Sequence, residues 1–125
     1  MPRVLIVDDN AEFTRMFGRL LTRAGFEVEE LTTPLGVNAR LLQRTPPIDI
    51  LVLDCIMPAL PGPQLLTLLA NNERTAAIPV LLISGVAEHA YVDAIQRHPR
   101  ARWSMKHDPV VMIEQVRELA DSLAA

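Results

Sequence analysis

Five polar residues stand directly after short runs that are rich in apolar residues. They are Asp8, Asp9, Asp54, Ser84 and Lys106. If the runs are parallel strands, their carboxyl ends meet at one edge of a sheet, where such sheets bind ligands. Three clustered carboxylates repel one another unless a proton or a cation neutralises them. Because Mg²⁺ takes oxygen ligands, the three aspartates predict a magnesium site at that edge.

The same set suits phosphoryl transfer, which depends mostly on positioning and charge neutralisation. A carboxylate such as Asp54 can attack phosphorus to give an acyl phosphate. The Ser84 hydroxyl and the Lys106 ammonium would then contact the phosphoryl oxygens. Taken singly, each residue has an ordinary explanation, because aspartates also cap helices and form turns. Only their joint placement indicates a site.

Five predicted strands alternate with five predicted helices. Strands are expected over residues 4–7, 26–31, 48–53, 78–83 and 101–105, the second near a sheet edge because apolar and acidic residues alternate in it. Helices are expected from a capping box with Asp9 as N-cap to Gly25, from Thr33 as N-cap to about residue 44, and over residues 64–71, 87–97 and 109–123. This alternation predicts an α/β fold with a doubly wound parallel sheet and helices on both faces.

The bulk composition restricts the class of protein. The chain has 125 residues, half of them apolar, which suits one domain with a hydrophobic core. Its formal net charge of −3 gives no support to nucleic-acid binding, which normally requires a basic face. The single cysteine, Cys55, excludes an internal disulfide and is typical of a reducing compartment. No apolar stretch reaches the roughly 20 residues of a membrane span, so a cytoplasmic protein is expected.

With these residues in place, the sequence resembles the receiver domain of two-component response regulators and is similar to the chemotaxis response regulator. Residues 4–10 match the opening strand and acidic pair of that family. Residues 51–62 match its phosphorylation motif, with Met-Pro and Gly at the family's spacings after Asp54. Ser84 and Lys106 follow Asp54 by 30 and 52 residues, where the family has its hydroxyl residue and its lysine.

The resemblance implies a fold and a phosphorylation site. The five-stranded sheet would have the flavodoxin-like order 2-1-3-4-5 with five helices on both faces. Residues 1–125 would form one receiver domain. Asp54 would be the phosphoacceptor, Lys106 would pair with the phosphoryl group, and Ser84 would turn inward to bond it as part of the switch.

The metal site and the output are implied in the same way. Mg²⁺ would be bound by the carboxylates of Asp8, Asp9 and Asp54 and by the backbone carbonyl of Ile56. Trp103 occupies the position of the family's switch aromatic, so phosphorylation would rearrange this side chain. The change would then reach the surface formed by the fourth helix, the fifth strand and the fifth helix.

The implied partners are proteins. The phosphodonor would be a sensor histidine kinase or a histidine phosphotransfer protein, and the signal would pass to a downstream protein or an output domain. The domain itself would bind neither nucleic acid nor membranes, and would catalyse nothing beyond its own phosphoryl transfer and dephosphorylation. Homodimerisation is left open.

Departures from the family pattern keep alternatives open. His107 replaces the usual proline after the lysine, so a degenerate receiver that acts as a phosphorylation-independent binding module stays in view. An aspartyl-phosphate phosphatase is the other alternative, although it normally needs an acid two positions after its nucleophile, where this chain has Ile56. Because Ile56 and Val86 are apolar residues flanking the phosphoryl position, slow self-dephosphorylation is expected. No glycine-rich phosphate loop follows the first strand, which disfavours nucleotide binding.

Overall fold

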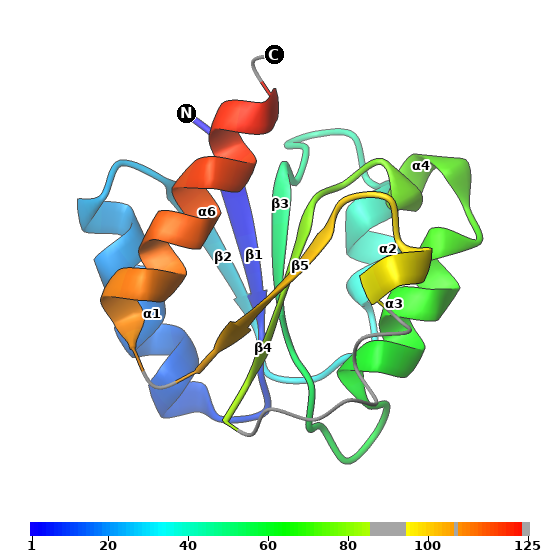
Figure 1. Ribbon diagram of the computed structural model, residues 1–125, viewed down its shortest axis with the longest axis horizontal. Coiled ribbons are helices and arrows are strands. Elements are labelled where there is room, and N and C mark those ends of the chain that lie inside the picture. Colours follow the sequence, from blue (N-terminus) through cyan, green and yellow to red (C-terminus); the bar gives the residue numbers. More distant parts are fainter. Residues whose placement is uncertain (86–94, 107, 124–125) are drawn as a thin grey trace.

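The computed structural model describes residues 1–85, 95–106 and 108–123, and these contain one five-stranded sheet. The strands are all parallel and lie in the order β2-β1-β3-β4-β5 (Figure 1). They are β1 (Arg3–Val7), β2 (Glu27–Leu31), β3 (Ile50–Asp54), β4 (Val80–Ser84) and β5 (Ala101–Met105). The predicted flavodoxin-like strand order and the edge position of the second strand are therefore confirmed.

Helices cover both faces of the sheet (Figure 1). α1 (Ala11–Arg23) and α6 (Pro109–Leu123) lie on one face, and α2 (Val37–Leu42), α3 (Gly62–Ala70) and α4 (Glu73–Ala76) lie on the other. Each side has its own cluster of buried apolar side chains. Every residue of β3 and β4 is buried. This double covering explains why these two strands are nearly continuous apolar runs.

The first helix has a different N-cap from the one expected. The cap is Asn10, whose side-chain oxygen accepts hydrogen bonds from the backbone N–H groups of Glu12 and Phe13 at 3.0 and 3.1 Å. The expectation that Asp9 caps this helix is wrong, because Asn10 already satisfies the free N–H groups of the first turn. The Asp9 carboxylate is thereby left for other contacts. Gly25 ends the helix as predicted, with a φ of 101°.

The short helices on the other face differ from the prediction. α2 begins at Val37 rather than at residue 34 and ends two residues early, at Leu42. The Thr33 hydroxyl accepts a backbone N–H within a turn, and Gly36 takes a φ of 92° before the helix can start. The sequence does not predict α4, a single turn whose Thr75 hydroxyl donates to a carbonyl of α3 at 2.6 Å. That turn depends on a contact between helices, which a local pattern does not reveal.

Some expectations fall outside the described part of the chain. Of the helix expected over residues 87–97, only residues 95–97 are described, and these are helical. Val86 and His107 also lie outside the described residues. Among the described residues, no helix combines the length and the apolar character needed to cross a membrane.

Candidate functional site

The acidic residues meet where β1 and β3 end side by side. Asp8 and Asp9 follow β1, and Asp54 is the last residue of the neighbouring parallel strand β3. Carboxylate oxygens of the three residues all lie within 4.8 Å of one another. Asp8 and Asp54 are buried, whereas Asp9 is exposed. The predicted convergence of these carboxylates is confirmed, and it provides a set of oxygen ligands that suits a divalent cation.

Lys106 supplies a positive charge to this cluster. Its Nζ lies 2.6 Å from Asp8 Oδ2 and 3.7 Å from Asp54 Oδ2. Apart from this ammonium, no donor among the residues described reaches Asp8 Oδ2. The Lys106 backbone N–H donates to the Ser84 carbonyl at 2.8 Å, which ties the start of the side chain to the end of β4. The lysine therefore acts as a tethered counter-charge for two buried carboxylates.

The surroundings of Asp54 make it harder to ionise. They raise its pKa to about 6, mainly because burial removes the carboxylate from water and also because Asp8 is negatively charged. The Lys106 charge and a backbone hydrogen bond from Ile56 lower the pKa and offset part of this effect. At neutral pH most molecules still carry the charge. Cation binding or bond formation at this carboxylate would relieve the unfavourable environment.

Phe13 of α1 also belongs to the site, and the sequence analysis did not assign it there. The Lys106 Nζ lies over its ring, 4.6 Å from the centroid. The ring stacks on Phe17, with centroids 5.6 Å apart. Because the face of an aromatic ring attracts a cation, Phe13 helps to hold the ammonium beside Asp8. The one signal in the sequence is its position, a single helical turn after Asp9.

The remaining predicted residues lie around the end of β3. Ser84 ends the adjacent strand β4 and is fully buried. Ile56 follows Asp54 in the next turn and is 60 % exposed. Trp103 lies in β5 and packs on the apolar cluster below α3, and its buried indole N–H has no hydrogen-bond partner within the described ranges. The structure thus brings Ser84 and Ile56 to the acidic cluster and leaves Trp103 in β5, two strands from β3.

Gly62 allows α3 to begin directly against the candidate nucleophile. A Cβ at this position would lie 2.2 Å from the backbone oxygen of Asp54. The Gly62 backbone N–H donates to the Cys55 carbonyl at 3.0 Å, which closes the turn after β3. The glycine of the predicted motif therefore fixes the backbone that carries Asp54.

Comparisons with known proteins agree with this geometry. The chain matches the response regulator receiver domain family over residues 4–99. It is 32 % identical over 88 residues to the DNA-binding dual master transcriptional regulator RpaA of Synechocystis sp., covering 70 % of this chain and 36 % of that protein. It is 35 % identical over 107 residues to protein-glutamate methylesterase/protein-glutamine glutaminase 1 of Anaeromyxobacter dehalogenans, covering 77 % and 29 %. The chain thus spans about a third of the length of these two relatives.

A smaller relative and a solved structure extend the comparison. Protein PilH of Pseudomonas aeruginosa is 32 % identical over 84 residues, covering 67 % of this chain and 68 % of PilH. The chemotaxis protein CheY4 of Vibrio cholerae superposes with a TM-score of 0.83 over 95 % of this chain and 98 % of that one, at 20 % identity, and supports the fold alone. Because the family match covers most of its length, this chain belongs to the response regulator receiver domain family of two-component signalling.

Proposed function

We propose that this receiver domain is a phosphorylation-dependent switch in which Asp54 accepts the phosphoryl group. The observation that carries the proposal is the acidic cluster, in which the Lys106 ammonium contacts the buried carboxylates of Asp8 and Asp54. Residues 1–125 would work as one receiver domain in the cytoplasm. Its phosphodonor would be a sensor histidine kinase or a histidine phosphotransfer protein.

The proposed transfer needs an ionised nucleophile and a neutralised phosphoryl group. A carboxylate oxygen of Asp54 attacks the phosphorus of a phosphohistidine, and a new P–O bond forms as the P–N bond breaks. The electron pair of the broken bond stays on the histidine nitrogen. Because the pKa of Asp54 is about 6, the attacking carboxylate is mostly charged at neutral pH. Lys106 and the Ser84 hydroxyl are proposed to contact the transferred oxygens.

The acidic cluster is also proposed to hold Mg²⁺. Asp8, Asp9 and Asp54 offer three carboxylates, and the backbone carbonyl of Ile56 is the fourth proposed ligand. The contacts of Lys106 with both buried carboxylates support this fit, because they indicate a site that needs a counter-charge. When bound, the ion would neutralise charge on the phosphoryl oxygens.

A route for the signal leads from Ser84 to β5. The Ser84 carbonyl accepts a hydrogen bond from the Lys106 backbone N–H. Movement at the end of β4 would therefore displace the end of β5. Beside Trp103 lies a hollow of about 350 Å³ that is lined by residues of β5 and α6 and by Asp108 between them. We propose that Trp103 moves there, changing a surface of β5 and α6 that contacts a downstream protein or an output domain. The expected output surface also included the helix predicted over residues 87–97, which lies mostly outside the described residues.

The decisive experiment measures phosphoryl uptake by intact mass. With Mg²⁺ and acetyl phosphate, the chain should gain one phosphoryl group, and Asp54→Asn should gain none. Asp121→Asn removes an exposed carboxylate of α6 and should leave uptake unchanged. Trp103 fluorescence should change when Mg²⁺ and beryllofluoride are added to the unmodified chain, and stay constant in Asp54→Asn.

Each failure of this experiment has a defined meaning. Unchanged mass and fluorescence in the presence of Mg²⁺ would contradict the proposed switch and favour the degenerate binding module. Rapid release of phosphate with turnover would favour the aspartyl-phosphate phosphatase. Phosphoryl uptake by Asp54→Asn at the same rate as the unmodified chain would show that another residue is the acceptor.

Phe13→Leu is expected to slow phosphoryl uptake more than its effect on folding explains. Leucine keeps an apolar side chain but loses the ring face that holds the Lys106 ammonium, an interaction worth about 0.5–2 kcal/mol. Uptake should therefore fall by roughly 2- to 30-fold. Phe17→Leu is the matched control, because it removes the stacked ring that does not touch Lys106. Equal uptake rates in the two variants would contradict the positioning role.

A further inference from the structure

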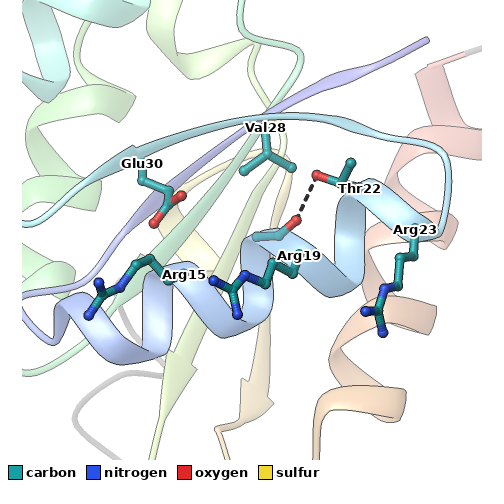
Figure 2. A pocket seen from close by; sticks show the side chains of 7 residues that line it. Arg15, Arg19, Thr22, Arg23, Val28 and Glu30 are labelled. Atoms are coloured by element: carbon teal, nitrogen blue, oxygen red, sulfur yellow. Dashed lines mark hydrogen bonds between the residues drawn. The ribbon is translucent and has the colours of Figure 1, made fainter.

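A groove that contains no residue of the acidic cluster runs between α1 and β2. It has a volume of about 360 Å³ and is lined by Arg15, Gly18, Arg19, Thr22, Arg23, Val28 and Glu30. Figure 2 shows Arg15, Arg19 and Arg23, here called the arginine row, along α1 with Val28 and Glu30 on the strand above. Gly18 lies along the groove, where a Cβ would be in van der Waals contact with Val28 and Glu30, at 3.4 Å.

The arginine row concentrates positive charge on an acidic protein. Its members are exposed, follow one another every four residues, and form no ion pair with any residue the structure describes. Two acids of β2 are paired elsewhere, Glu27 with Arg3 and Glu29 with both Arg3 and Arg40. The third, Glu30, lines the groove without an ion pair to the row in the described structure, and its single charge offsets only one of the three arginines. Arg40 belongs to α2, on the opposite face of the sheet from α1. The row is therefore available to an anionic partner.

The outer edge of β2 adds backbone hydrogen-bonding groups to the same groove. β2 is the last strand of the sheet, and it pairs only with β1 among the described residues. The N–H of Glu27 and the carbonyl of Leu31 bond to the β1 segment. Because backbone groups of successive strand residues point to opposite sides, those of Val28 and Glu30 point away from β1. These are the two β2 residues that line the groove.

We infer that the groove binds an extended acidic segment of a partner protein, which adds a strand to the free edge of β2. Every second side chain of an extended segment faces the same way, at a spacing of about 6.5 Å. The arginine row has a spacing of about 6 Å, from four residues at 1.5 Å each. A segment with Asp or Glu at alternate positions thus places one carboxylate against each arginine while its backbone bonds to Val28 and Glu30.

The outward-facing backbone groups of Val28 and Glu30 favour a strand over a helix, because the backbone groups of a helix already bond within the helix. An added strand would lie about 4.8 Å beyond β2. The inference uses none of the residues of the acidic cluster. It therefore stands or fails independently of the proposed phosphorylation.

A labelled peptide of four Thr-Glu repeats tests the inference with the whole chain, using fluorescence anisotropy at low salt. The combined Arg15→Gln, Arg19→Gln and Arg23→Gln variant should bind about 10-fold more weakly, because three exposed ion pairs together contribute roughly that factor. A matched variant with Arg44→Gln, Arg100→Gln and Arg117→Gln removes the same charge from exposed arginines outside the groove. It should bind nearly as tightly as the unmodified chain.

Backbone pairing has its own measurement. Hydrogen exchange at the amides of Val28 and Glu30 should slow in the complex, because the added strand would accept their hydrogen bonds. Equal loss of binding in the two arginine variants would overturn the inference, since net charge alone would then explain it. Equally tight binding of a Thr-Gln peptide, or binding that leaves both amides unprotected, would also overturn it.

Discussion

Gly62→Ala is expected to lower the free energy of unfolding by about 3 kcal/mol, at the upper end of overpacking costs. The added Cβ would lie 2.2 Å from the backbone oxygen of Asp54. A backbone atom cannot turn aside as a flexible side chain can, so α3 must shift away from β3. The expected sign is opposite to helix propensity, which favours alanine over glycine by about 1 kcal/mol. Thermal unfolding should show a melting temperature about 10 °C lower.

Gly85→Ala is the control for this substitution. A Cβ at Gly85 meets no atom of the described structure within 4 Å. Its effect on the free energy of unfolding should therefore stay within about 0.5 kcal/mol. If Gly62→Ala were as stable as Gly85→Ala, the close approach of α3 to Asp54 would not be a constraint on this fold. Where Gly62→Ala still folds, phosphoryl uptake should fall, because the displaced backbone carries the nucleophile.

Asp54→Asn is expected to raise the free energy of unfolding at pH 8 by about 1–3 kcal/mol in the absence of divalent cations. The pKa of Asp54 is raised to about 6 in the folded chain, against about 3.9 in an unfolded one. Between these values the folded state binds more protons, so stability falls as the pH rises through this window. Above pH 6 the full cost of the buried charge is present. Asparagine carries no charge and avoids that cost.

Urea unfolding at two pH values checks this sign. Near pH 4 the variant and the unmodified chain should be much closer in stability, because Asp54 is then protonated when folded. At pH 8 with a chelator, Asp54→Asn should be the more stable, whereas Asp121→Asn, at an exposed position, should show no such gain. Lower stability of Asp54→Asn at pH 8 would mean that the attraction between Lys106 and the ionised Asp54 exceeds the combined cost of burying that charge and of its repulsion by Asp8. Added Mg²⁺ should stabilise the unmodified chain and have less effect on Asp54→Asn.

Local patterns predicted most of the scaffold. β5 and α6 have the bounds that the sequence indicated, and the other strands lie within two residues of them. β3 and β4 are the most strongly patterned, because a strand covered by two helix layers is apolar over nearly its whole length. The predicted bounds were wrong where a neighbouring residue could form the cap or turn instead. Asn10 caps α1 in place of Asp9, and a turn at Thr33 delays α2 to Val37.

The sequence by itself determined which residues gather at the acidic site. Strand ends carry Asp8, Asp9, Asp54, Ser84 and Lys106, and a parallel sheet places such ends at one edge. The resemblance to a receiver domain depended on this placement, on the spacing between the residues, and on the motifs over residues 4–10 and 51–62. The family match is consistent with it.

Only the tertiary structure decided the environment of those residues. The raised pKa of Asp54 and the Phe13 ring beneath the Lys106 ammonium each depend on elements that are distant in sequence. The close approach of Gly62 to Asp54 depends on how α3 packs against the end of β3. The groove between α1 and β2 likewise depends on how a helix lies over a strand edge. The physical reason is common to all four. Burial, charge and steric contact depend on distances between packed elements, and residue spacing along a chain does not specify these distances.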